Sequence, residues 1–383
     1  MKSKIKDMPL MEETDENIVM FYPHVPEASK KSVLDTLNSR WIGQGPKVKL
    51  FEEKFRDKFS PNFSALATGS GTDALHLAYM LADLKPGDEV VAPLFTCTAT
   101  NIPFLYMGVR INFADINLDT MNIDVRHVRE LMNSNVKAIV CVHYGGLPCD
   151  MDELNEIAQE WGVPIIEDAA HAVGAKYKGK DIGSISEFTM YSFQAIKHIT
   201  TGDGGMLLIK NNELLSKAER LRWFGIDRSA KQGGIWENDI IEIGYKYQMT
   251  DIAAAMGIES LSEFDETLKL RQQLFKLYES ELKNIEEVKI IGANSDDREH
   301  AAWMFTIAVE RRFELQNKLR DHKIESNQVH FRNDRYTIFE EFTKGKVFPN
   351  MDKIENNYLV LPLHTKMTFD DVKRVCNVIK SGW

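Results

Sequence analysis

Asp168 and Lys197 are the two residues whose types and positions most strongly suggest a reaction. Asp168 follows the apolar run 164–167, and a carboxylate at the end of a buried strand can keep a pyridine nitrogen protonated. Lys197 stands just before the glycine-rich stretch 201–205, and a lysine amine can form an imine with an aldehyde. Pyridoxal phosphate (PLP) requires both groups of a protein, so the pair predicts an enzyme with this cofactor.

Each of these residues also has an ordinary structural explanation. Asp168 could cap a helix that starts at residue 169, and most lysines simply lie at the surface. Two neighbouring features favour the chemical interpretation: Ser192 could offer its hydroxyl to a phosphate, and the turn 202–205 would let the chain double back beneath a cofactor. His171 would then approach the phenolic oxygen of the cofactor, although a lone histidine is more often structural. Burial or imine formation would lower the pKa of the lysine toward neutrality.

A second candidate feature is the small-residue turn 69–73, which includes Gly71, Thr72 and Asp73. Backbone N–H groups at such a turn, together with the N-terminus of the following helix, favour a bound phosphate. A tight connection between a strand and a helix would look the same. The turn therefore gains weight only because Asp168 and Lys197 already suggest a phosphorylated cofactor.

Short apolar runs alternate with amphipathic stretches through the first two thirds of the chain. This alternation predicts an α/β domain with a largely parallel sheet, in which ligands bind beyond the carboxyl ends of the strands. The turn 69–73 and Asp168 both follow predicted strands. We expect strands at 64–68, 89–92, 110–116, 136–142, 164–167, 188–193 and 206–209, and helices at 72–82, 98–107, 125–132 and 151–161.

The pattern changes after about residue 257, and we expect three parts in the chain. Residues 1–18 are polar and acid-rich and predict a mobile leader, 19–257 form the large cofactor-binding domain, and 258–383 form a smaller α+β domain. In this last part we expect helices at 260–282, 312–321 and 369–380, and strands at 288–291, 303–309 and 357–361.

Composition excludes several other classes of protein. The 383 residues carry a formal charge of −10, which gives no support to nucleic-acid binding. The four cysteines lack CxxC spacing, so we expect reduced thiols and no metal site. We see no signal peptide and no apolar run near the roughly 18 residues of a membrane span. The expected compartment is the cytoplasm, without a membrane partner.

The chain resembles the sugar aminotransferases of the DegT/StrS group within the fold-type I PLP enzymes. The resemblance runs from about residue 20 to 260, and it is weaker beyond that. The spacing from Ser192 through Lys197 to Gly205 is specific to the group, whereas the turn 70–72 is not. The matching stretches are 41–46, 51–52, 70–75, 167–171, 192–197 with Gly205, and 249–254.

The resemblance implies what the enzyme does and which residues take part. The reaction would move an amino group from glutamate or glutamine to the keto group of a nucleotide-linked deoxy sugar, with pyridoxamine phosphate as the intermediate cofactor form. The product would serve cell-surface polysaccharide such as the O-antigen of lipopolysaccharide. A homodimer would share its active sites across the interface. Lys197 would bind the cofactor, Asp168 its pyridine nitrogen, His171 its phenolic oxygen, and Gly71, Thr72, Asp73 and Ser192 its phosphate.

Three positions depart from the pattern of the group. Cys97 stands where an aromatic ring usually stacks on the cofactor, and Phe95 is the nearest substitute. Lys246 replaces the asparagine that normally reaches the phosphate of the partner subunit, where it would act as a charge. The region expected to contact the sugar is unusually basic: His330, Arg332 and Arg335 are candidates for binding an anionic substrate, since guanidinium groups suit phosphates and carboxylates. A solvated loop is the alternative there.

Three rival functions stay open at this stage. A sugar 3-dehydratase of the same group carries histidine at the imine position, but here that position is Lys197 and His198 falls one residue later. The substrate could instead be a keto or aldehyde sugar without a nucleotide. A PLP-binding regulator without turnover is the third possibility, and its absorbance would not respond to amino acids.

Overall fold

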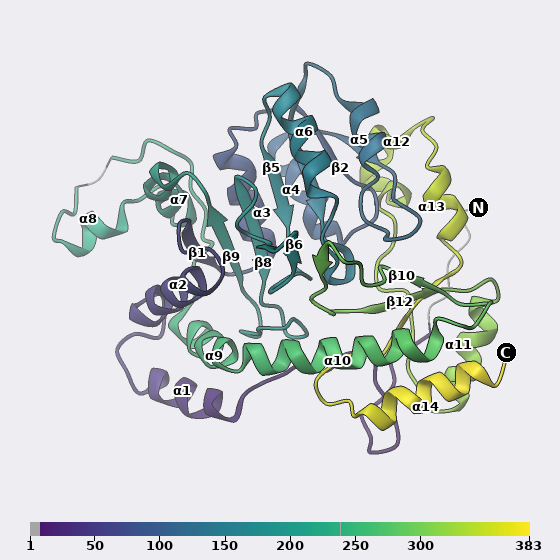
Figure 1. Cartoon of the computed structure of the whole chain (residues 1–383). Coiled ribbons are helices and arrows are strands. Elements are labelled where there is room, and N and C mark those ends of the chain that lie inside the picture. Colours follow the sequence, from purple (N-terminus) through teal and green to yellow (C-terminus); the bar gives the residue numbers. More distant parts are fainter. Residues whose placement is uncertain (1–7, 238) are drawn as a thin grey trace.

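A seven-stranded, mainly parallel sheet forms the centre of this computed structural model, which describes residues 8–237 and 239–383 (Figure 1). The strand order is β1-β9-β8-β5-β4-β2-β3. Strand β9 runs antiparallel to both β1 and β8, and the other neighbouring pairs are parallel. The strands are β1 Ser64–Thr68, β2 Glu89–Pro93, β3 Arg110–Ala114, β4 Val136–Val142, β5 Ile165–Asp168, β8 Phe188–Ser192 and β9 Gly205–Ile209.

Successive residues of each strand enter two different apolar cores, one on either face of the sheet. In β4, Val140 belongs to the core beneath α3 and α4, whereas Cys141 belongs to the core beneath α2 and α6. This period of two is the normal geometry of a strand covered by helices on both faces. The helices are α2 Pro46–Phe59, α3 Gly71–Leu81, α4 Thr98–Met107, α5 Val125–Leu131 and α6 Met151–Trp161.

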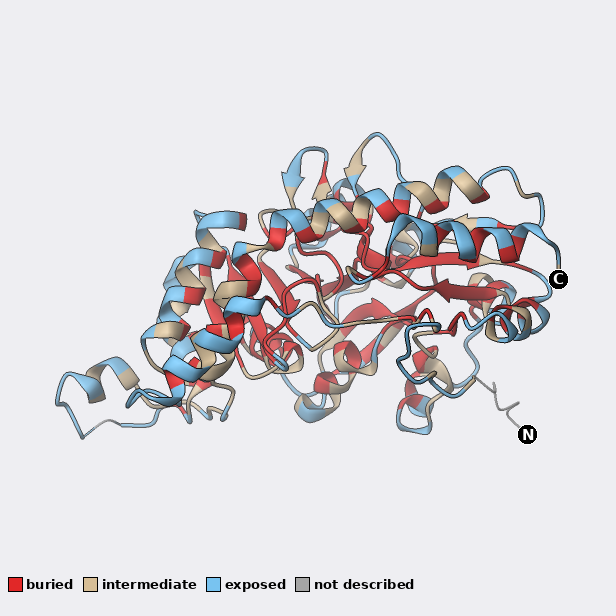
Figure 2. Cartoon of the chain, turned by 90° about the horizontal axis from the view of Figure 1, so that it is seen from below, coloured by how far each residue is buried: buried red, intermediate tan, exposed pale blue. Residues whose placement is uncertain are grey.

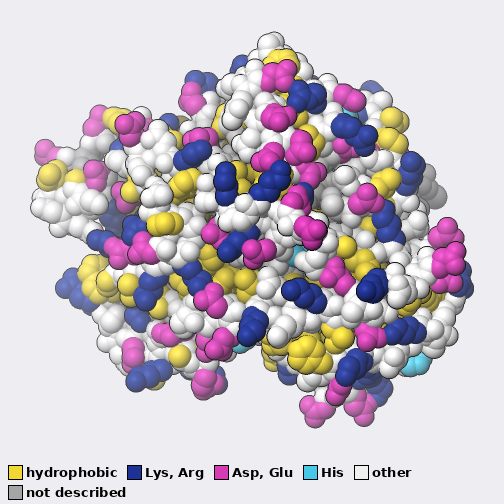
Figure 3. All heavy atoms as spheres, in the orientation of Figure 1, with side chains coloured by type: hydrophobic (Ala, Val, Ile, Leu, Met, Phe, Trp, Pro, Cys, Tyr) yellow, Lys and Arg dark blue, Asp and Glu magenta, His cyan; other side chains and the backbone are white. Residues whose placement is uncertain are grey.

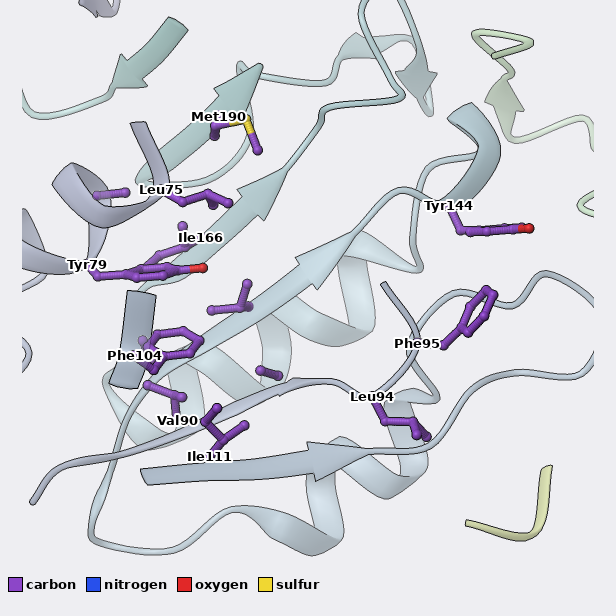
Figure 4. Close-up of a cluster of buried hydrophobic side chains, with 14 of the residues drawn as sticks. Leu75, Tyr79, Val90, Leu94, Phe95, Phe104, Ile111, Tyr144, Ile166 and Met190 are labelled. Carbon is purple, nitrogen blue, oxygen red and sulfur yellow. The ribbon is translucent and has the colours of Figure 1, made fainter. Parts of the chain in front are cut away.

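The core on the α3 side is rich in aromatic and branched side chains. Tyr79 and Phe104 stack with ring centroids 4.1 Å apart, and Ile166 and Met190 of the sheet join the same cluster (Figure 4). Coloured by burial, the strands of the sheet lie inside a shell of half-exposed helices (Figure 2). The predicted α/β fold with a large, mainly parallel sheet is confirmed, and it places the carboxyl ends of β1, β5 and β8 along one edge.

A second, antiparallel sheet lies in the C-terminal part of the chain, with strand order β10-β12-β13. Helices α10, α11 and α14 build an apolar core around it that is separate from the two cores of the large sheet. The two-domain division with its boundary at 257 stays a proposal. The elements are α9 Asp251–Ser262, α10 Phe264–Leu282, β10 Lys289–Ile291, β12 Phe305–Ala308, α11 Arg312–Asp321, α12 Glu340–Thr343, α13 Pro349–Ile354, β13 Tyr358–Leu361 and α14 Phe369–Lys380.

Residues 8–18 run along this C-terminal part. Ile18 forms a parallel bridge with Ile324, and the backbone of Met8 exchanges two hydrogen bonds with the side chain of Asn327. The expected mobile leader therefore has these contacts over residues 8–18, and residues 1–7 lie outside the described part. The helix α1 Glu27–Leu37 follows and packs against α9.

Two smaller features complete the fold. A short sheet joins β11 Arg298–Glu299 to the hairpin β6 Lys176–Tyr177 and β7 Lys180–Asp181. Beyond α7 Leu215–Arg222, a projecting arm with α8 Arg228–Gln232 extends from the body at the left of Figure 1. Apolar side chains on this arm are exposed, and a few yellow atoms lie on the arm at the left edge of Figure 3. They are Ile235, Trp236, Ile240, Ile241 and Ile243.

Candidate active site

Asp168 is the last residue of β5, and its carboxylate is buried at the edge of the sheet where the predicted site residues meet. The hydroxyl of Thr100 donates to Oδ2 over 2.7 Å, and the backbone N–H of Ala170 donates to Oδ1 over 3.1 Å. Both donors are neutral, and burial raises the pKa of Asp168. A cationic pyridine nitrogen would supply the opposite charge that such a buried carboxylate needs.

Lys197 lies in the connection between β8 and β9, and its side chain is partly buried. The backbone N–H of Lys197 donates to Gln194 O over 2.9 Å. Burial lowers the pKa of its amine to about 8, and the negative charge of Asp168 partly opposes this shift. Roughly one amine in ten is thus neutral at pH 7, far more than for a surface lysine. The structure brings the predicted amine and carboxylate into one electrostatic environment.

His171 lies in the loop that follows β5, and it is buried. Its Nδ1 atom has no hydrogen-bond partner, and its ring stacks on His330 with centroids 5.4 Å apart. Burial is the main cause that lowers the pKa of His171 well below its usual value, and nearby Lys197 adds to it. The imidazole is therefore neutral near pH 7, and one buried nitrogen is free to bond an oxygen of a ligand.

The N-terminus of α3 forms the other end of the site. Ser70 caps this helix, because its hydroxyl accepts the backbone N–H of Asp73 over 3.1 Å. Thr68 pairs with Gly205, which in turn pairs with Ser192, so the turn 69–73, which follows β1, and Ser192, which ends β8, lie at the same edge of the sheet, on either side of β9. A Cβ on Gly205 would lie 2.5 Å from Ser70 O, so the close approach requires glycine here.

Gly71, the first residue of α3, lets this helix start close to β8. A Cβ on Gly71 would lie 3.4 Å from the hydroxyl oxygen of Ser192 and 3.1 Å from the sulfur of Met190. Thr72 and Asp73 stand beside it in the first turn of α3. Free N–H groups at the start of a helix and an adjacent serine hydroxyl are a suitable pair of donors for a phosphate.

These groups fit the chemistry of PLP. They are a buried carboxylate, an amine of lowered pKa, an unpartnered imidazole nitrogen, and a helix N-terminus beside a serine. They match, in that order, a pyridine nitrogen, an aldehyde, a phenolic oxygen and a phosphate. All of them come from the carboxyl edge of one sheet, as expected for a ligand site in an α/β fold.

The two residues considered for ring stacking have different surroundings. Cys97 is exposed and precedes α4, and its influence on the pKa of Lys197 indicates that the two are close. Phe95 is buried, and its ring lies 5.3 Å from those of both Tyr144 and Tyr358 (Figure 4). The ring of Phe95 is therefore part of the core. A cofactor contact of Cys97 remains a prediction.

The residues predicted to bind the substrate have different surroundings: one lies at the site, and two are paired with carboxylates. His330 lies at the site, since it stacks on His171 and its Nε2 atom is buried without a hydrogen-bond partner. The guanidinium of Arg332 is ion-paired with Asp334, Asp352 and Glu355, and Arg335 is paired with Glu355 over 2.9 Å. The charge of Arg332 is thus already balanced by acidic side chains. Binding of a substrate anion by either arginine remains a prediction.

Lys246 lies in the segment that returns from the arm to α9, and it is exposed. Its amine donates to Gln248 Oε1 over 2.7 Å. A phosphate contact of Lys246 remains a prediction. Two side chains at the site are not anticipated from the sequence. Thr100 donates to Asp168, and the ring centroid of Trp303 lies 3.7 Å from Nζ of Lys197. Nothing in the sequence around Trp303 indicates chemistry.

The family model of the DegT/DnrJ/EryC1/StrS aminotransferase family matches residues 23–380. The chain belongs to this family. Among curated relatives, the spore coat polysaccharide biosynthesis protein SpsC of Bacillus subtilis (strain 168) is 34% identical and is matched over 94% of this chain and 95% of its own. GDP-perosamine synthase of Escherichia coli O157:H7 is 31% identical, over 94% and 97% of the two chains.

Solved structures agree with this membership. The sugar aminotransferase CalS13 from Micromonospora echinospora has a TM-score of 0.91 and 29% identity, over 96% of this chain and 100% of its own. Spr1654 from Streptococcus pneumoniae was solved in a pyridoxamine phosphate form, with a TM-score of 0.89 and 29% identity over 95% and 98% of the chains, and also in a PLP form. The protein is a PLP-dependent sugar aminotransferase of fold type I. In the described residues, no helix has the length and apolar character needed to cross a membrane.

Proposed function

We propose that this enzyme moves an amino group from glutamate or glutamine to the keto group of a nucleotide-linked deoxy sugar used for cell-surface polysaccharide. The convergence of Lys197 and Asp168 at one sheet edge is the observation that supports transamination at this site. The substrate class is supported by two relatives: SpsC is named for spore coat polysaccharide biosynthesis, and GDP-perosamine synthase is named for a GDP-linked sugar.

The proposed roles follow from the surroundings of each residue. When bound, PLP supplies an electron-poor ring that accepts the electron pair left by a cleaved C–H bond. The Nζ atom of Lys197 would take the proton from the α-carbon of the amino donor and deliver it to the cofactor carbon on the other side of the shared nitrogen, which an amine with pKa about 8 can do near neutral pH. Asp168 would hold the pyridine nitrogen in its protonated form, and His171 would bond the phenolic oxygen through its free nitrogen.

The phosphate would be held by Gly71, Thr72, Asp73 and Ser192. Burial raises the pKa of Asp73, so its carboxyl is more readily protonated than a surface carboxyl and can more easily lie near a phosphate. His330 is the proposed substrate contact, because its buried Nε2 atom lacks a partner beside His171. Arg332 and Arg335 would first have to give up carboxylate partners before they could bind an anion.

The enzyme is proposed to act as a homodimer in the cytoplasm. Support for the dimer comes from the exposed apolar side chains of the arm, such as Trp236 at 75% exposure and Ile243 at 82%. A monomer rarely exposes a group of large apolar residues of this kind without a partner for them. The neighbouring Lys246 would then reach the phosphate in the other subunit.

The direct test measures amination of a panel of nucleotide-linked keto sugars by the purified protein with glutamate or glutamine. We expect formation of an amino sugar with at least one nucleotide-linked substrate, and loss of this activity in Lys197→Ala. A matched control is Lys210→Ala, which removes a surface lysine at the end of β9. Amination of only nucleotide-free sugars would overturn the substrate class, and normal turnover by Lys197→Ala would overturn the role of Lys197.

A further inference from the structure

The indole of Trp303 lies against the amine of Lys197. The Nζ atom is 3.7 Å from the centroid of the ring, and the indole Nε1–H donates a hydrogen bond of 3.2 Å to Ile196 O. One side chain thus contacts both the reactive amine and the backbone just before it. Trp303 comes from the loop before β12, in the C-terminal part of the chain, and only 2% of it is exposed.

A second side chain at the site stacks on this indole. His171 stacks on Trp303 with centroids 3.8 Å apart and ring planes inclined by 14°. A ring this close covers the face on which it stacks, so the indole cannot swing away from the position in which it meets the Lys197 amine. Phe21, which follows the segment 8–18, adds a further stacked contact with centroids 5.5 Å apart.

Backbone contacts fix the position of the indole independently of any ligand. The N–H groups of Trp303 and Met304 both donate to Gly145 O, over 3.0 and 3.1 Å. The buried guanidinium of Arg271 donates to Trp303 O over 3.3 Å. The loop of Trp303 is therefore attached to the large sheet on one side and to α10 on the other. Such a fixed surface can hold a flexible side chain in one place.

We propose that Trp303 is the positioning residue that holds the Lys197 amine while this amine is not bonded to the cofactor. The inference rests on the proposed role of Lys197 as the cofactor-binding lysine. During each half of the reaction the freed amine must stay near the substrate carbon and carry one proton between two carbons. An aromatic face attracts an ammonium group, so the indole retains the amine after it has taken the proton.

The first test uses the cofactor-free protein and leaves Trp303 unchanged. A charged ammonium against an indole face alters the emission of that indole, so part of the tryptophan fluorescence should titrate with a midpoint near pH 8. We expect this component to disappear in Lys197→Met, which keeps the length of the side chain without the charge. A wild-type titration that matches that of Lys197→Met would overturn the proposal.

The second test compares Trp303→Phe, which keeps an aromatic face, with Trp303→Leu, which does not. With α-deuterated glutamate in single-turnover reactions, we expect Trp303→Leu to slow the first half-reaction by about 10- to 100-fold and to raise its deuterium isotope effect. Trp303→Phe should stay within about fivefold of wild type, and PLP affinity should change little in both. A slower reaction with an unchanged isotope effect would overturn the proposal.

The two claims fail in different ways. If Lys197→Met still aminates sugar at the wild-type rate, the proposed function of Lys197 is wrong. If Lys197→Met is inactive but Trp303→Leu reacts like wild type, only the role of Trp303 is wrong. Melting curves of both Trp303 variants show whether each is folded, and if Trp303→Leu is not, the fluorescence titration still decides the question.

Discussion

At the scale of single residues, the site depends on groups that are shifted from their usual protonation by burial. Within the described residues, the hydrogen-bond donors to the Asp168 carboxylate are neutral groups of Thr100 and Ala170. Burial lowers the pKa of the Lys197 amine to about 8 and keeps His171 neutral. Shifts of this kind need a rigid, partly dry site. They make the roles of these side chains testable one at a time.

Replacing the carboxylate should remove much of the activity. Asp168→Asn keeps the shape of the side chain but cannot balance a charged pyridine nitrogen, so we expect kcat to fall by about 100-fold or more. Thr100→Val is the graded comparison, because it removes the hydroxyl bonded to Oδ2 and leaves the charge. Its loss should be about tenfold or less. Steady-state kinetics that show equal losses for the two variants would contradict this account.

The pH dependence of cofactor capture should follow the Lys197 amine. Only the neutral amine attacks an aldehyde, so the rate at which cofactor-free protein binds PLP should rise with pH up to about 8 and then level off. Because the negative charge of Asp168 raises the pKa of Lys197, Asp168→Asn should move this midpoint to lower pH. Stopped-flow absorbance measures both, and a rate that keeps rising toward pH 10 would argue against a buried amine.

At the scale of elements, one close approach between backbones shapes the proposed phosphate end of the site. The turn before α3 meets β9 where Gly205 faces Ser70 O, and a methyl group there would lie 2.5 Å from that oxygen. Ser70 O is a backbone atom, and the backbone of Gly205 is paired with strands on both sides, so neither can move without a large cost in free energy. The N-terminus of α3 can therefore lie this close to β9 only because residue 205 is glycine.

Gly205→Ala should therefore displace the start of α3. We expect PLP affinity to fall about tenfold or more, since overpacking of this kind costs about 1–3 kcal/mol. Gly43→Ala is the matched control, because a Cβ there meets no atom within 4 Å, and its PLP affinity should stay within about twofold of wild type. Equilibrium dialysis with PLP makes the comparison, and equal affinities for the two variants would refute the close-contact argument.

Local patterns in the sequence predicted much of this arrangement. Strand β4 at 136–142 and helices α4, α6, α11 and α14 have the expected bounds, because each is a clear apolar period between turn residues. The prediction of one helix at 260–282 is wrong in its start. Residues 260–262 belong to the end of α9, and α10 begins at Phe264. Helices α1 and α2 were missed, since charged residues dilute their apolar faces.

At the candidate site, local sequence patterns indicate some residues, whereas other residues reach the site only through tertiary packing. Asp168, Lys197 and the turn before α3 carry their own signals, because each stands at the end of a predicted strand or beside glycines. Trp303 is far away in the sequence and reaches the site only through the packing of its loop on Gly145. The carboxylates around Arg332 are likewise brought there by tertiary structure, and no sequence spacing reveals them.

At the scale of the whole molecule, the projecting arm is the feature that supports the proposed dimer. It extends away from the body beyond α7 (Figure 1). Isoleucines and a tryptophan on this arm are exposed. Lys246 lies where the arm returns to the body. In the proposed dimer, an intact active site combines Lys197 of one subunit with Lys246 of the other.

Mixing two inactive variants tests this sharing of sites. Lys197→Ala and Lys246→Ala should each lose activity, but random exchange of subunits should restore roughly a quarter of the wild-type activity, since half of the dimers are hybrids with one intact site. Mixing Lys197→Ala with Asp168→Ala should restore none, because both residues act within the same chain. Recovery in neither mixture would show that Lys246 does not complete a site of the partner subunit.

The most direct measurement of the central claim identifies the lysine that binds the cofactor. The purified protein is saturated with PLP, treated with borohydride to make the linkage permanent, digested, and mapped by mass spectrometry. Our account predicts a single modified peptide with the cofactor on Lys197, and a loss of that modification when free pyridoxamine phosphate is supplied instead. Stoichiometric modification of any other lysine, with Lys197 untouched, would contradict it.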